Sequence, residues 1–90
     1  MNWEPGSKWR TWFFYVERPL VAGDKTIPVK FSFDVLEKHF GINDLTVAKY
    51  HEYAERVEDK VLDAVTRRLR SVPESEYPVY LSVTPQDLAA

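Results

Sequence analysis

The sequence predicts an α+β fold in which a three-stranded, mainly antiparallel sheet packs against one short and one long helix. Three runs of aromatic and β-branched residues predict the strands, two of them before residue 32 and the third near residue 80. Residues 46–70 contain no Gly or Pro and carry apolar residues three and four positions apart, which predicts an amphipathic helix. Ninety residues can enclose one hydrophobic core, so we expect one domain at residues 10–90 after a loose N-terminal arm at residues 1–9.

The first strand is expected at residues 10–16, RTWFFYV. Side chains alternate between the two faces of a strand. Trp12 and Phe14 would therefore face the helices, whereas Phe13 and Tyr15 would lie on the opposite side. Because both faces are apolar, this strand predicts a sheet that is covered on both sides.

The second strand follows a predicted turn. Residues 17–26 contain Pro19 and the pair Gly23-Asp24, which are typical of turns. Residues 27–31 then return as a strand, with apolar side chains at every second position facing the helices.

Two helices and a third strand complete the predicted order β-β-α-α-β. Ser32 suits a helix N-cap because its hydroxyl can accept a hydrogen bond from the first turn, and Gly41 suits the left-handed position after a short helix. The long helix is expected over residues 46–70 and ends before Pro73, and the last strand is expected at residues 77–83. The letters TPQD that follow predict a capped turn with Pro at its first position.

Composition excludes several classes of site. The chain has no cysteine, so it has no disulfide, no thiolate zinc site and no cysteine nucleophile. Its net charge is −2, whereas a dedicated nucleic-acid binder is usually basic. No apolar run has the length of a signal-peptide core or a membrane span. We therefore expect a cytoplasmic protein that makes no contact with membranes.

Residues 27–41 (IPVKFSFDVLEKHFG) and 79–88 (VYLSVTPQDL) carry a resemblance to a known family. The first segment is a strand followed by a Ser-started helix with an acidic residue, a Leu two positions later and a closing Phe-Gly pair. The matching positions are Ser32, Asp34, Leu36, Phe40 and Gly41. On these residues the chain resembles the bacterial family called domain of unknown function 1488, over residues 10–88. The resemblance implies a bacterial cytoplasmic protein and no catalytic or binding residues, because the family has none assigned.

The sequence carries no recognisable catalytic or metal-binding constellation. His51 and Glu55 are four residues apart on the long helix and could share a metal ion, but a stable site needs three or four ligands. His39 has no such spacing to another ligand, and the carboxylates of the long helix alternate with Lys and Arg as on a solvated surface. We expect no catalytic residue, no metal, no cofactor and no enzymatic activity.

Two groups of side chains remain as candidate binding sites. The first is the sheet face away from the helices, where we expect Phe13, Tyr15 and Tyr80 with the cations Arg10 and Lys30 beside them. Aromatic residues and Arg are enriched in protein interfaces, and they also stack unpaired bases. Three alternatives are open for this face: self-association, a cover formed by the tryptophans of the N-terminal arm, or an external ligand.

The second group is basic and lies at the end of the long helix. Arg67, Arg68 and Arg70 could contact phosphate, although cations at a helix C-terminus also compensate the helix dipole. From both groups we expect a non-catalytic protein-interaction or regulatory module that forms a homodimer, with an unknown protein partner also compatible. The alternative is a nucleic-acid-binding accessory protein that uses the aromatic sheet face and the basic helix end.

Overall fold

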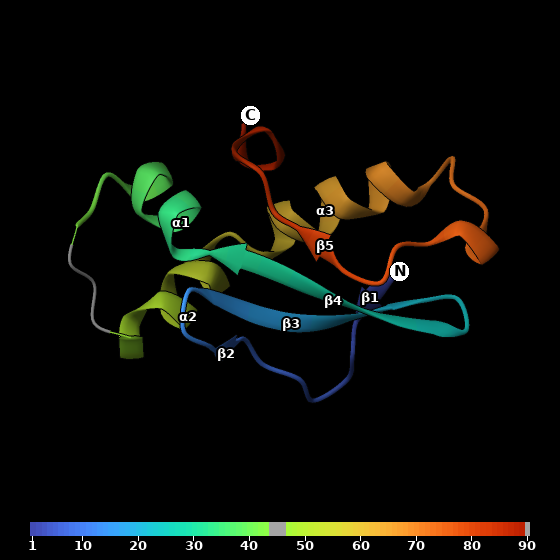
Figure 1. Cartoon of the computed structure of the whole chain (residues 1–90), viewed down its shortest axis with the longest axis horizontal. Helices are drawn as coiled ribbons and strands as arrows, with labels where there is room; N and C mark the ends of the chain where they lie inside the picture. Colours follow the sequence, from blue (N-terminus) through green and yellow to red (C-terminus); the bar gives the residue numbers. More distant parts are fainter. Residues whose placement is uncertain (44–46, 90) are drawn as a thin grey trace.

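The computed structural model describes residues 1–43 and 47–89. Its centre is an antiparallel hairpin of two long strands, β3 (Tyr15–Ala22) and β4 (Lys25–Ser32), which runs along the molecule (Figure 1). Gly23, with a φ of 63°, lies in the turn between the two strands. The second predicted strand is therefore confirmed within β4.

Three short strands flank this hairpin. On one side β3 pairs antiparallel with β1 (Asn2–Trp3) and with β2 (Arg10–Thr11), and on the other side β4 pairs parallel with β5 (Leu81–Ser82). The described residues thus form a mixed, five-stranded sheet. The α+β class is confirmed, but the predicted three-stranded, mainly antiparallel sheet is wrong in strand number and in the direction of the last strand.

The helices are α1 (Phe33–Phe40), α2 (Val47–Arg56) and α3 (Glu58–Leu69), and two 3₁₀ turns follow at η1 (Glu74–Glu76) and η2 (Pro85–Leu88). They cover one face of the sheet. The core between the layers is formed by buried side chains of β3 and β4 together with those of the helices and of the C-terminal segment: Val16, Leu20, Ala22, Ile27, Val29, Phe31, Leu36, Ala54, Val61, Val65, Leu69, Leu81, Val83 and Leu88.

Three predicted caps are confirmed. The Ser32 hydroxyl accepts a hydrogen bond from the Val35 amide at 3.2 Å, which begins α1, and Gly41 ends this helix with a φ of 65°. The third cap begins η2, where the Thr84 hydroxyl accepts a hydrogen bond from the Asp87 amide and Pro85 follows at the first position. Each of these junctions depends on local hydrogen bonding, which residue type alone can indicate.

The predicted first strand at residues 10–16 is wrong because a tight turn interrupts it. The amide of Trp12 donates to the carbonyl oxygen of Tyr15 at 2.8 Å, so Phe13 and Phe14 form the tip of a β2–β3 hairpin. Trp12 and Phe14, which were expected to face the helices, are exposed instead. A two-residue hairpin tip usually contains Gly, Asn or Asp, and no such residue marks this one.

The predicted turn at residues 17–26 is wrong over most of its length, because β3 continues through Pro19 to Ala22. Pro19 lies opposite Pro28 in the register, and its carbonyl oxygen accepts a hydrogen bond from the Glu4 amide at 3.0 Å. The backbone of Pro19 therefore points toward the edge of the sheet and not toward β4. A proline is tolerated there because the hairpin needs no amide hydrogen at that position.

The single long helix predicted over residues 46–70 is two helices. Its predicted start at Thr46 lies outside the described residues. The break is at Val57, whose φ of −119° and ψ of 12° leave the helical region. The Val57 amide donates to the carbonyl oxygen of Ala54 at 3.2 Å, so the last turn of α2 is tightened. The apolar stripe continues across the break, with Ala54 and Val61 both buried, and this continuity hides the break from the periodicity.

The predicted third strand at residues 77–83 is much shorter in the structure. Only Leu81 and Ser82 pair with β4, opposite Val29 and Lys30. Val79 lies two positions before the buried Leu81, yet it is exposed. Residues 77–80 do not extend the pairing, and Pro78 within them lacks an amide hydrogen for the ladder.

The N-terminal arm, expected to be loose, packs against the domain. Trp9 is 4% exposed and meets Phe31 edge to face, with ring centroids 6.0 Å apart, and Trp3 packs edge-on against Trp9. Arg18 joins the arm to α3, because its guanidinium pairs with Glu58 and donates to the Ser7 hydroxyl. These contacts place both tryptophans on the helix-facing side of the sheet, so they do not cover its open face.

Candidate functional site

The open face of the sheet carries an unusual concentration of aromatic side chains. Alternation along β3 and β4 turns Tyr15 and Lys30 away from the core, because their neighbours Val16 and Phe31 are fully buried. The parallel pairing of β5 sets Ser82 beside Lys30, and Tyr80 lies two residues earlier on the same side. We define the aromatic face as the seven residues Arg10, Trp12, Phe13, Phe14, Tyr15, Lys30 and Tyr80.

Cations and rings alternate along this face. The Arg10 guanidinium lies 5.4 Å from the Trp12 ring centroid, and the Trp12 and Tyr15 rings stack at 6.4 Å. Lys30 lies between two tyrosines, with its Nζ atom 5.1 Å from the Tyr15 ring centroid and 4.4 Å from that of Tyr80. Each such contact stabilises an exposed pair by about 0.5–1 kcal/mol. These contacts favour the observed arrangement of the side chains, which no core packing supports.

The hairpin tip is fixed by its backbone while its rings point into solvent. The carbonyl oxygen of Phe14 accepts a hydrogen bond from the amide of Phe33 at 3.0 Å, which ties the tip to the start of α1. Phe13 is nevertheless 89% exposed and Phe14 is 79% exposed. Two rings held this far out of the core contribute little to the stability of a single chain.

A groove of about 480 Å³ lies beside the tip, on the aromatic face. It is lined by Phe14, Tyr15, Lys30, Ser32, Tyr80, Ser82 and Val83. Within the described part of the chain its lining includes one cation and no carboxylate. The groove can therefore receive an apolar or aromatic group. Lys30 favours negative charge in it, and Glu17, which lies opposite both Lys30 and Arg10 in the register, partly offsets that preference.

Of the five residues expected to form the interface, the structure brings Tyr15, Lys30 and Tyr80 into contact. Arg10 is linked to them through the Trp12 ring, and Phe13 is exposed at the neighbouring hairpin tip without a contact to the other four. Sequence reasoning missed Trp12 and Phe14, which it assigned to the helix-facing side, and the groove residues Ser32 and Ser82. The two rings were misplaced because the turn reverses the alternation. Four consecutive aromatic residues, Trp12 to Tyr15, were the only available signal, and they indicate a strand as readily as an exposed tip.

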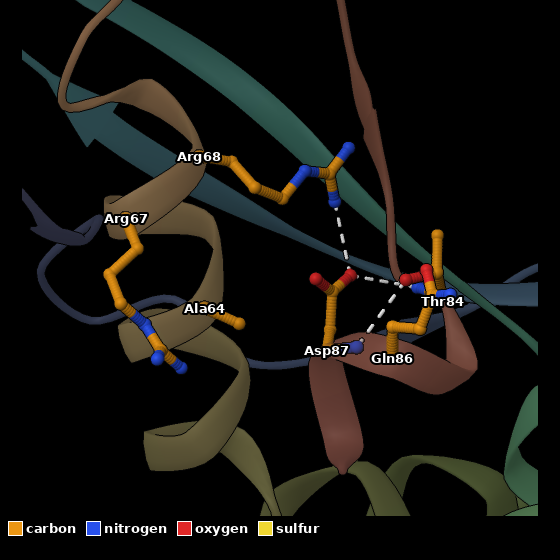
Figure 2. A pocket seen from close by; sticks show the side chains of 6 residues that line it. All are labelled: Ala64, Arg67, Arg68, Thr84, Gln86 and Asp87. Atoms are coloured by element: carbon orange, nitrogen blue, oxygen red, sulfur yellow. Dashed lines mark hydrogen bonds and ion pairs between the residues drawn. The ribbon is translucent and has the colours of Figure 1, made fainter.

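The three arginines at the end of α3 have different environments. Arg68 donates from Nη1 to Asp87 Oδ2 at 3.0 Å and to the carbonyl oxygen of Ser82 at 3.0 Å. Figure 2 shows Arg68 reaching from the helix to Asp87, whereas Arg67 makes no contact with that carboxylate. All three arginines are exposed, and 39% of the Arg68 side chain stays accessible. Through Nη1, Arg68 helps to hold the C-terminal segment on α3, which reduces the number of its donors that are available to a phosphate.

A cavity of about 550 Å³ opens at this junction and is lined by Ala64, Arg67, Arg68, Thr84, Gln86 and Asp87 (Figure 2). Within this cavity Asp87 Oδ2 accepts hydrogen bonds from Arg68 and from the Thr84 amide, the latter at 2.8 Å. This oxygen is therefore already engaged within the chain. The junction belongs to the helical layer, whereas the aromatic face lies on the other side of the sheet. The two candidate sites thus do not form one continuous surface.

The histidines have no metal-binding arrangement in the part of the chain that the structure describes. His39 packs edge-on against Phe40, with centroids 4.9 Å apart. No three His, Asp or Glu side chains of residues 1–43 and 47–89 gather as a ligand set. No helix among these residues has both the length and the apolar character needed to cross a bilayer.

No family model matches the chain, and neither the curated proteins nor the solved structures include a similar protein under the comparisons made. The resemblance to domain of unknown function 1488 stays a prediction.

Proposed function

We propose that this chain is a non-catalytic interaction module that forms a homodimer through its aromatic face. The observation that carries the proposal is the exposure of four neighbouring aromatic residues: Trp12 at 42%, Phe13 at 89%, Phe14 at 79% and Tyr80 at 50%. A contiguous exposed apolar patch on a small protein marks a surface that another molecule covers. Tyr, Trp, Phe and Arg are also the residues enriched at the centre of protein interfaces.

The size of the patch supports a protein partner. At about 150–250 Å² per aromatic side chain, four rings that are 42–89% exposed offer about 400–650 Å² on each copy. Two copies that meet through this surface would bury about 800–1,300 Å², which reaches the lower end of the roughly 1,200–2,000 Å² typical of specific interfaces. A cysteine-free chain is compatible with a reducing compartment, and we propose the cytoplasm as its location.

The test is the mass in solution, measured by size-exclusion chromatography with light scattering. We expect the wild-type chain to be a dimer and the double variant Phe13→Ser/Phe14→Ser to be a monomer. Because neither ring packs in the core, the variant should keep the thermal stability that the wild type has at a concentration at which it is monomeric. Val79→Ser is the matched control, since it also shortens an apolar residue that is 87% exposed but lies outside the aromatic face. A monomeric wild type, or a dimer that survives the double substitution, would contradict the proposal.

A second candidate function is the binding of single-stranded nucleic acid. The alternation of cations and rings along the aromatic face supports it, because unpaired bases stack on aromatic side chains while cations hold the phosphates. The net charge of −2 and the engagement of Arg68 with Asp87 favour the homodimer. An absorbance ratio at 260 and 280 nm across the chromatographic peak, followed by titration with a poly-dT oligonucleotide at low salt, separates the two candidates.

A further inference from the structure

The aromatic face contains both a projecting ring and a recess of matching chemistry. Phe13 projects into solvent from a turn whose backbone is fixed by hydrogen bonds. The groove beside it is bounded by Phe14 and Tyr80 and has Lys30 among its lining residues. Phe13 does not line the groove of its own chain, and its side chain is 89% exposed.

We propose that Phe13 of one copy inserts into the groove of a second copy, so that each molecule contributes one projecting ring and one recess. This inference rests on the proposed homodimer and specifies how it is built. In a dimer with two-fold symmetry, each residue pair across the interface occurs twice. Because the ring and the recess lie side by side on one face, the same two-fold operation can satisfy both contacts and leaves neither free to recruit a third copy.

The cation of Lys30 distinguishes this arrangement from a plain contact between apolar surfaces. The only charged residue that lines the groove within the described chain is Lys30, whose Nζ atom lies over the rings of Tyr15 and Tyr80. An inserted phenyl ring brings a third π face to this cation, which is an attractive contact. A positive charge at position 13 would instead meet Lys30 at short range in a partly desolvated site, where like charges repel strongly.

The experiment compares two substitutions of opposite charge at position 13. A purely apolar contact predicts that Phe13→Glu and Phe13→Lys weaken the dimer equally. Insertion beside Lys30 predicts that Phe13→Lys raises the dimer dissociation constant at least about tenfold more than Phe13→Glu, because only the lysine meets a like charge. Sedimentation equilibrium over a dilution series gives the dissociation constant of each variant.

A charge exchange then tests the pairing directly. Adding Lys30→Glu to Phe13→Lys should recover at least about tenfold of the lost affinity, because the two charges become opposite across the interface. The matched control adds Lys25→Glu to Phe13→Lys, since Lys25 is an exposed lysine of the same strand that does not line the groove. This control should recover nothing, and circular dichroism should report the same fold for every variant.

The outcomes separate this inference from the proposed function. If the wild type dimerises but the charge of residue 13 has no effect and Lys30→Glu restores nothing, the insertion is wrong and the homodimer stands. If the wild type is a monomer at every concentration, both are wrong. Quenching of the exposed Trp12 by poly-dT with the chain still monomeric would likewise overturn both and assign the face to nucleic acid.

Discussion

Both faces of the sheet carry several aromatic rings, but the rings on one face are buried in the core and most of those on the other are exposed. On the helix-facing side Trp9 and Phe31 pack edge to face and are buried. On the open side the rings of Trp12 and Tyr15 stack against each other, and Trp12 stays substantially in water. The hydrophobic contribution of an aromatic residue to folding is gained only where its ring is buried. The aromatic content of this sequence therefore divides into a part that folds the molecule and a part that is available to a partner.

The largest effect is expected on the free energy of unfolding when a buried phenylalanine is compared with an exposed one. Phe31→Ala should lower the free energy of unfolding by about 3–5 kcal/mol, because it empties a fully buried site between the sheet and the helices. Phe13→Ala should change it by less than about 0.5 kcal/mol at a concentration at which the chain is monomeric. Urea denaturation followed by circular dichroism measures both. Equal losses would mean that the hairpin tip is packed in solution.

An intermediate effect is expected at the junction of α3 with the C-terminal segment. Asp87→Ala should lower the free energy of unfolding by about 1–2 kcal/mol, because it removes the capping carboxylate and leaves Arg68 without its ion-pair partner. Arg67→Ala, at the exposed neighbour in the same cavity, should cost less than about 0.5 kcal/mol. Thermal melts provide the comparison, and a larger loss for Arg67→Ala would reverse the assignment of these two arginines.

The smallest effect is expected within the aromatic face of a single chain. A double-mutant cycle of Lys30→Met and Tyr80→Leu should give a coupling energy of about 0.5–1 kcal/mol, the value typical of an exposed cation–π contact. The cycle is measured by chemical denaturation of the monomer. A coupling near zero would show that Lys30 does not hold Tyr80 in solution. The open face would then contribute nothing through this pair to the stability of the single chain.

Sequence reasoning succeeded where one residue type determines the local geometry. Ser32, Gly41 and Thr84 were correctly expected to begin or end helical segments, since each cap depends on hydrogen bonds or backbone angles that few other residues provide. The alternation of residues 27–31 likewise identified the buried face of β4. These signals are local and do not depend on the rest of the fold.

It failed where tertiary contacts override a local pattern. The tip at Phe13 and Phe14 contains no turn-forming residue, and it is held by the amide of Phe33 from another element. The break at Val57 leaves the apolar spacing intact, so periodicity could not reveal it. At the candidate site, Tyr15, Lys30 and Tyr80 lie together as expected, whereas the alternation that assigned Phe13 does not hold across the turn. The groove depends on the register of β5 against β4, which no local pattern encodes.

The parallel pairing of β5 also sets a time order during synthesis. Leu81 pairs with Val29, which leaves the ribosome about fifty residues earlier, so one wall of the groove is made long before the other. Until Tyr80 and Ser82 have emerged and docked, Lys30 has one ring beside it, and there is no recess for an incoming phenylalanine. In the dimer that we propose, the hairpin tip at Phe13 is thus made before the groove that would receive it.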